Sequence, residues 1–399
     1  MTRGPLAVAS AVTALLLLAT PAHAADPVTV ADGLAFPAGI AFDSTGTMYV
    51  TERAGRILSF EGKKANVLAT ITTITEGETG LLGIAVSPDD RFVYVFATEP
   101  DFTNAVWRVP IEGGEPHKVV GGLPGSVYHN GGGVAFGDDG NLYISNGEKH
   151  DTGLAQNPNA FGGKVYRYTP DGEIPSDNPF PHSPAFSIGH RNPFGLTFDP
   201  VSGDPFVTEN GPEAFDEINH IQAGGNYGWP IVYGPATSDQ VSNLQGEYHD
   251  PVVAYESVIV PTGIAFADPD DSLPFVAGDL FFGTYGDQTI HRVVLDHDRS
   301  SALKDIEWFH SEEPIIAMAW GPRGLYFSTP DAIKVFDLAR TKSSGGTNAP
   351  VGAPSNAPGA SIDQPGSDRP VAALLFGGAA ALLIGALVFA FGGKKRGRT

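Results

Sequence analysis

The sequence predicts an all-β protein, a six-bladed β-propeller, with an N-terminal signal peptide and one C-terminal transmembrane helix. Three observations lead to this prediction. The chain carries 50 glycines and 33 prolines among short runs of valine, isoleucine, phenylalanine and tyrosine, which is typical of short strands joined by turns. A unit of about 50 residues recurs six times, within the range of propeller repeats. Apolar segments suited to export and to membrane insertion lie at the two ends.

Residues 1–24 have the pattern of a secretory signal peptide. Arg3 provides the positive n-region, residues 6–19 form the apolar segment, and Ala-His-Ala at residues 22–24 gives the small-x-small cleavage pattern. We therefore expect cleavage after Ala24. An uncleaved N-terminal anchor is the alternative, which the short apolar run disfavours.

Residues 25–340 form the expected propeller domain. Each copy of the repeat has a turn, an apolar strand, an Asp/Gly turn and a second apolar strand. A further strand follows at residues 56–60, 105–109, 164–168 and 289–294. Such sheets cannot bury both faces alone, whereas radial stacking around an axis does bury them, and the regularity of the repeat favours a propeller over a β-sandwich. The expected first and second strands of the six copies are residues 37–42 and 47–51, 80–86 and 92–97, 131–136 and 141–145, 193–198 and 205–208, 261–266 and 279–283, and 315–320 and 324–328.

The C-terminal region predicts a membrane anchor. Residues 341–370 are mainly serine, glycine, proline, alanine and asparagine, a composition typical of a disordered linker. Residues 371–391 contain only apolar residues and glycine, enough for a transmembrane helix, although a buried core helix is the alternative. The tail, residues 392–399, is basic, so the positive-inside rule places it in the cytoplasm. We expect the domain to be exported, at the cell surface or in the periplasm.

Charge argues against nucleic-acid and anionic-lipid partners, and the absence of cysteine excludes thiolate metal sites. Without Arg3 and the four basic tail residues, 19 basic residues remain against 45 acidic ones, a net charge of about −26. Such a surface disfavours binding to nucleic acid or anionic lipid headgroups. Because the chain has no cysteine, any metal must bind to oxygen or nitrogen ligands.

Four motifs stand between residues 187 and 232: GHRNPFG at 189–195, ENGP at 209–212, DEIN at 216–219 and NYGWP at 226–230. In these motifs the sequence resembles the PQQ-dependent glucose and aldose sugar dehydrogenases. Weaker similarities extend over nearly the whole exported domain, including GLLG at 80–83, HNGG at 129–132 and GDLF at 278–281. The resemblance implies a quinoprotein oxidoreductase with a six-bladed propeller and a site at the axial mouth.

The resemblance also implies the residues of the site. His129 would remove the proton from the anomeric hydroxyl of the sugar while hydride passes to PQQ, and an imidazole titrates in the right pH range for this task. Arg191 would stabilise the negative charge that develops on the quinone, and Asn192 would contact the same ligand. The glycines Gly131 and Gly132 would let the cofactor approach the backbone closely.

A calcium ion is the second expected cofactor. The resemblance places it at the carbonyl oxygens of Gly211 and Pro212, since Ca²⁺ prefers several oxygen ligands, with Asp216 and Tyr227 supporting the turn. A purely structural turn is the alternative. The other histidines show no spacing typical of metal ligands, and we interpret them as surface or packing residues. Among them, His190 is expected at most to support the groups that contact the ligand.

Several positions depart from the family pattern. Glu78 replaces a glutamine, Tyr128 replaces an acidic residue, and the cations that the family places near Gly286 and before residue 315 are missing. Since PQQ is a tricarboxylate, these changes should weaken its binding, and Glu78 should repel it. Lys149, Lys164 and Arg323 are the candidate replacements.

Two functions therefore remain open at the level of the sequence. The first is a sugar dehydrogenase that oxidises an aldose at C1 to the lactone, with PQQ, Ca²⁺ and an external electron acceptor. The alternative is a non-catalytic cell-surface propeller that binds a glycan or a protein and has a degenerate PQQ site. The retained His129, Arg191 and Asn192 favour the enzyme, whereas the missing cations favour the binding protein.

Overall fold

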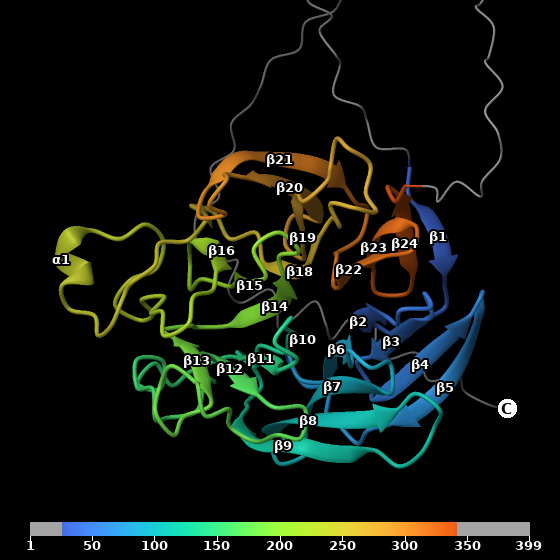
Figure 1. Ribbon diagram of the computed structural model, residues 1–399, viewed down its shortest axis with the longest axis horizontal. Helices are drawn as coiled ribbons and strands as arrows, with labels where there is room; N and C mark the ends of the chain where they lie inside the picture. The colour runs from blue at the N-terminus through green and yellow to red at the C-terminus, as the bar shows by residue number, and fades with distance from the viewer. Residues whose placement is uncertain (1–25, 341–399) are drawn as a thin grey trace, which may run out of the picture.

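The computed structural model describes residues 26–340, which form six four-stranded antiparallel sheets around a central axis (Figure 1). Five sheets are consecutive in the chain, β2–β5, β6–β9, β10–β13, β14–β17 and β18–β21. The sixth combines β22–β24 with β1. The strands are β1 (Val28–Ala31), β2 (Pro37–Phe42), β3 (Met48–Glu52), β4 (Arg56–Glu61), β5 (Lys64–Thr70), β6 (Leu81–Val86), β7 (Phe92–Thr98), β8 (Thr103–Pro110), β9 (His117–Pro124), β10 (Val134–Phe136), β11 (Leu142–Asn146), β12 (Lys164–Tyr168), β13 (Ala185–Ile188), β14 (Pro193–Phe198), β15 (Pro205–Glu209), β16 (Asp216–His220), β17 (Val253–Tyr255), β18 (Pro261–Phe266), β19 (Leu280–Thr284), β20 (Thr289–Leu295), β21 (Ala302–His310), β22 (Met318–Gly321), β23 (Gly324–Ser328) and β24 (Ile333–Asp337).

The prediction of an all-β propeller with six blades is confirmed, and most of the expected inner strands are correct within one residue. Two inner strands begin later than expected. β10 starts at Val134 rather than residue 131, because Gly131 and Gly132 have positive φ angles of 69° and 129° and cannot continue an extended strand. β22 starts at Met318 rather than residue 315.

The ring is closed by pairing the two ends of the described chain. β1 lies antiparallel to β24, with Val28 opposite Val335 and Ala31 opposite Ile333. The first strand of the chain thus completes the last blade, which Figure 1 shows as a blue strand beside orange ones. The repeat did not predict this pairing, because it joins segments about 300 residues apart.

Buried hydroxyl groups connect neighbouring blades near the axis. Each belongs to the second strand of one blade and donates to a carbonyl oxygen at the inner strand of the next. Thr208 Oγ1 donates to Thr262 O at 2.8 Å, and Ser328 Oγ donates to Pro37 O at 2.8 Å, across the closure of the ring. Thr51 bonds Leu82 O in the same way. Apolar strand faces fill the space between blades. Hydrogen bonds of this kind therefore fix how each blade is aligned with the next.

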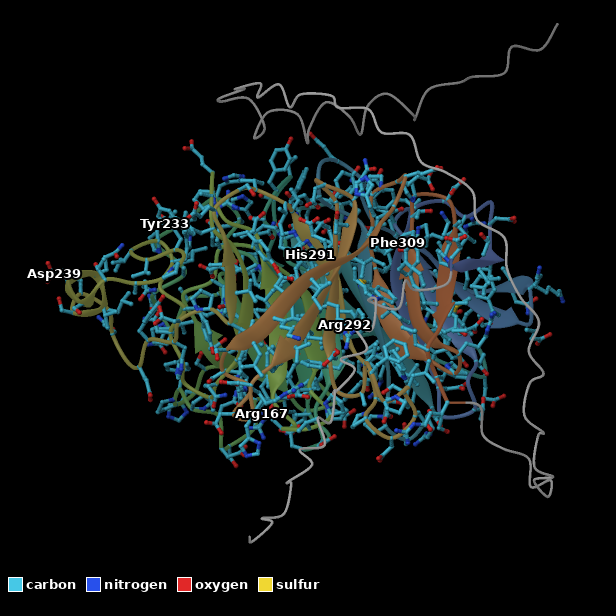
Figure 2. All side chains as sticks on the ribbon, turned by 90° about the horizontal axis from the view of Figure 1, so that it is seen from above. Arg167, Tyr233, Asp239, His291, Arg292 and Phe309 are labelled. Carbon is cyan, nitrogen blue, oxygen red and sulfur yellow. The ribbon has the colours of Figure 1, made fainter. Side chains whose placement is uncertain are left out.

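The two ends of the propeller differ. The loops before the inner strands and after the second strands lie at one end, which we call the site face. Figure 2 shows Tyr233 toward this face and Arg167, near the end of β12, toward the opposite one. A cavity of about 460 Å³ runs along the axis between the six inner strands. Blade four carries an insertion with the short helix α1 (Ser238–Val241), which projects from the side of the ring (Figure 1).

The terminal predictions fall outside the described residues. They concern the signal peptide, residues 1–24, the linker, residues 341–370, the transmembrane helix, residues 371–391, and the basic tail, residues 392–399. Within residues 26–340 the structure has no helix that is long and apolar enough to cross a membrane.

Candidate active site

His129 lies at the site face, in the loop that leads into β10. Its imidazole is buried and has Nδ1 2.6 Å from Glu148 Oε1. Glu148 follows β11, the antiparallel neighbour of β10, so the pairing of the two strands brings both side chains to the same end of the blade. The acceptor carboxylate orients the ring with Nδ1 protonated, which leaves Nε2 as the basic nitrogen.

Glu148 was not among the predicted site residues. It is buried, its backbone N–H donates to Arg191 O at 2.9 Å, and its Oε2 has no hydrogen-bond partner among the described residues. The repeat did indicate an acidic residue at this position. Glu52 and Glu209 close the second strands of blades one and four, and Glu148 follows the second strand of blade three. An acidic residue thus recurs at the site-facing end of this strand.

Glu78 holds the loops of two other blades together. Its Oε2 accepts a hydrogen bond of 2.8 Å from the backbone N–H of His129 and one of 3.2 Å from Asn192 Nδ2. Asn192 Oδ1 in turn accepts from Gly131 N at 3.0 Å. These donors stabilise the carboxylate of Glu78, so the residue acts as a link between blades in addition to adding negative charge.

Arg191 lies beside this network, in the turn before β14. Its Nη1 donates to Asn210 O at 2.8 Å, and its guanidinium lies over the ring of Trp229, 5.5 Å from the centroid. Burial lowers the pKa of Arg191 from its ordinary value, while Glu209 and Glu148 act in the opposite direction. Arginine remains a cation at neutral pH under these conditions. The site therefore presents a fixed positive charge near His129.

A buried chain of polar groups supports Arg191 from below. The Oε1 atom of Glu209 accepts the backbone N–H groups of Arg191 and Asn192, at 3.0 and 2.6 Å. Its Oε2 bonds His190 Nδ1 at 2.8 Å, and His190 Nε2 bonds Ser187 Oγ. His190 is therefore a positioning residue behind the site.

The turn expected to bind calcium is braced by Asp216. Its Oδ1 accepts from Gly211 N at 2.8 Å, and its Oδ2 accepts from the backbone of Ile259 and Val260. Tyr227 lines the same small cavity as Gly211, and its hydroxyl donates to His220 O at 2.6 Å.

A small cavity adjoins the turn, with a volume of about 10 Å³, close to the space that one water molecule needs. Its lining includes Arg191, Glu209, Gly211, Glu217 and Trp229.

The two predicted glycines owe their place to packing. A Cβ on Gly131 would lie 2.7 Å from Ser145 O, and one on Gly132 would lie 2.8 Å from Leu82 Cδ1. Close neighbours in the same blade, for Gly131, and in the preceding blade, for Gly132, together with the positive φ angles, therefore favour glycine at both positions. That they also contact a cofactor stays a prediction.

Of the three replacement cations, only Lys149 lies exposed beside His129. Its backbone N–H donates to His129 O at 3.3 Å. Lys164 is fully buried, and its Nζ donates to the carbonyls of Leu154, Ala155 and Gly162. Arg323 pairs with Asp337 where β24 ends, at the opposite face. Lys164 and Arg323 are therefore wrong as cofactor ligands.

His150 also contributes to the site, although the sequence pattern placed it among surface residues. It is exposed, as expected, but its ring stacks on that of His129, with the centroids 3.8 Å apart and the planes 25° apart.

A family model described as Glucose / Sorbosone dehydrogenase matches residues 34–333. The chain belongs to this family. The resemblance that the motifs suggested is thereby confirmed, and the match spans all six blades.

Named relatives within the glucose/sorbosone dehydrogenase family agree with this placement. The chain is 30% identical to quinoprotein glucose dehydrogenase B of Acinetobacter calcoaceticus, over 52% of this chain and 53% of that protein. It is 34% identical to aldose sugar dehydrogenase YliI of Escherichia coli, over 43% of this chain and 49% of that protein. The chain thus matches about half the length of these two curated relatives.

Solved structures of the family are similar over most of their length. The PQQ-bound aldose sugar dehydrogenase of Streptomyces coelicolor shares 33% identity with a TM-score of 0.68, over 77% of this chain and 95% of that one. A glucose dehydrogenase-type oxidoreductase of Thermus thermophilus shares 31% identity with a TM-score of 0.70, over 77% of this chain and 98% of that one.

Proposed function

We propose that the protein oxidises an aldose at its anomeric carbon to the lactone, with PQQ as the hydride acceptor. The observation that carries this proposal is the pairing of His129 with Glu148 beside the fixed cation of Arg191. A base beside a fixed cation at the same mouth suits the removal of a proton and a hydride from one carbinol group. The PQQ-bound relative from Streptomyces coelicolor supports the choice of cofactor.

The donor set fits a flat, anionic quinone at the site face. Arg191 uses Nη1 on Asn210 O, which leaves further guanidinium donors for a ligand. Lys149 adds an exposed cation beside His129. Arg191, Asn192 and Lys149 would therefore hold the group, which supplies a two-electron acceptor when bound.

The residues of the chain divide the remaining work. His129 Nε2 takes the proton of the anomeric hydroxyl, and the Glu148 carboxylate stabilises the imidazolium that results. Arg191 would stabilise the negative charge that develops on the hydride acceptor. Burial of His129 and Glu148 keeps water away from this pair, which strengthens both effects.

Further parts of the proposal concern calcium and location. We place Ca²⁺ at the carbonyls of Gly211 and Pro212, in a turn that Asp216 supports. We also propose that the signal peptide exports the domain and that residues 371–391 anchor it in the cytoplasmic membrane, with the site outside. An external electron acceptor would then reoxidise the cofactor.

The test is a titration of the purified full-length chain with PQQ and Ca²⁺, followed by addition of a panel of aldoses. We expect stoichiometric changes in quinone absorbance and sugar-dependent reduction. His129→Ala should lower the rate of reduction by roughly 10²–10⁴-fold. His297→Ala, at an exposed position, is the matched control and should change nothing. Absence of PQQ binding at saturating Ca²⁺ would favour the alternative, a propeller that binds a glycan or a protein without turnover.

A further inference from the structure

Two histidines and a glutamate converge at the mouth of the site. The donor atoms of His129, Glu148 and His150 all lie within 4.8 Å of one another. His129 and Glu148 are buried, whereas His150 is exposed. Two imidazoles and one carboxylate form the ligand set of zinc sites that keep a fourth position open.

The backbone brings His150 over His129. Lys149 and His150 both have positive φ angles, 50° and 65°, and this turn carries the chain back across the loop that holds His129. The imidazoles stack as a result. Because His150 stands at the surface, it can turn about its side-chain torsions without disturbing the packing beneath.

Glu148 provides an independent sign of a ligand. It is 1% exposed, and its Oε2 has no hydrogen-bond partner among residues 26–340. A buried carboxylate oxygen without a donor is unfavourable by roughly 1–3 kcal/mol. A cation bound at this point would satisfy it.

Charges of both signs surround His150. The carboxylates of Glu148 and Glu78 attract a cation at the ring of His150, whereas Arg191 and the neighbouring Lys149 oppose it.

We propose that His129, Glu148 and His150 form a binding site for Zn²⁺ that inhibits the enzyme when it is occupied. An ion on His129 Nδ1 leaves the proton of the ring on Nε2, the atom that otherwise serves as the base, so metal binding and sugar oxidation exclude each other. Two ligand atoms on a tetrahedral ion lie about 3.3 Å apart. His129 Nδ1 and Glu148 Oε1 therefore separate from 2.6 Å by a small movement, and His150 turns toward the ion.

The experiment measures metal binding directly, in the full-length chain without PQQ. Zn²⁺ is titrated calorimetrically, and Co²⁺ is used as a spectroscopic substitute whose visible bands report four-coordinate nitrogen and oxygen ligation. We expect one strong site per chain. His150→Ala should weaken Zn²⁺ binding at least tenfold, and Glu148→Gln should do the same.

His182→Ala is the matched control. His182 is exposed and has a similar φ of 62°, but it lies outside the cluster. Absence of a strong site, or an equal effect of His150→Ala and His182→Ala, would overturn the proposal. Because His150 is exposed, its variant tests the site even if Glu148→Gln fails to fold. The result does not depend on sugar oxidation, so it can fail or succeed separately from the proposed function.

Discussion

At the scale of residues, the site depends on carboxylates that take different roles. Glu148 orients His129, Glu209 supports the turn of Arg191, and Glu78 links the loops of separate blades. That His129, Arg191 and Asn192 lie together could be predicted because they stand in motifs that resemble a family, and their catalytic roles stay predictions. Glu148 and His150 could not be predicted in the same way, because their roles depend on a strand pairing and on a left-handed turn that local sequence does not specify.

Replacing Glu148 by glutamine should reduce catalysis while leaving sugar binding nearly intact. The amide can still accept a hydrogen bond from His129 Nδ1, but it carries no charge to stabilise the imidazolium. We expect kcat to fall by roughly 10- to 100-fold with little change in KM. Steady-state kinetics will check this, with exposed Glu247→Gln as the control. An unchanged kcat would show that the pair has only a structural role.

Glu217 predicts a dependence of stability on pH. It lies on β16, accepts hydrogen bonds from Gly234 N and Asn219 Nδ2, and burial raises its pKa to about 7 from 4.5. The folded state therefore keeps a proton that the unfolded chain loses between these values. The stability that this group contributes is present below pH 4.5 and is lost as pH rises through 7, roughly 3 kcal/mol in all.

Glu217→Gln should remove this loss. The amide nitrogen can donate to Asn219 Oδ1, which is buried without a partner. The variant should therefore gain stability relative to the natural protein between pH 4.5 and pH 8. Urea unfolding in the presence of a metal chelator, at pH 4.5 and at pH 8, measures the difference in unfolding free energy between the variant and the natural protein. If the difference is the same at the two values, Glu217 does not titrate in this range.

At the scale of elements, inner strands were predictable and outer strands were not. Inner strands are short apolar runs that repeat six times. Outer strands such as β5 and β21 are largely exposed along their length, so they lack the apolar pattern that identifies a strand. The hydroxyl groups between blades were also missed, since serine and threonine are common in strands for other reasons.

Thr208→Val tests these contacts between blades. The Thr208 hydroxyl accepts from Gly195 N and donates to Thr262 O, both at 2.8 Å, and valine has nearly the same shape. The variant leaves two buried groups unpaired, so we expect a loss of roughly 2–4 kcal/mol in unfolding free energy. Half-buried Thr197→Val, on the paired strand, is the control. Equal losses in the two variants would mean that the link between blades adds nothing.

At the scale of the whole molecule, stability depends on closing the ring. β1 covers the edge of β24, and Ser328 bonds Pro37 across the same junction. Five blades are local in sequence, whereas the sixth joins both ends of the described chain. A repeat can predict how many blades there are, but it contains no information about which strand closes them.

Deleting β1 should therefore destabilise the entire domain. Removal of residues 26–31 exposes the edge of β24, and we expect Tm to fall by roughly 5–10 °C or more. Removal of residues 26–27 alone retains the strand and is the control. Thermal unfolding followed by circular dichroism compares them. A Tm that is the same for both truncations would show that the sixth blade is stable with three strands.

The closure of the ring also sets the order of events during synthesis. β1 leaves the ribosome before its partner β24, which is made about 300 residues later. At 5–20 residues per second this separation corresponds to roughly 15–60 s. Throughout that interval β1 is a strand without its neighbour, open to pairing with other chains. The newborn protein should therefore depend most on chaperones just before its last blade is complete.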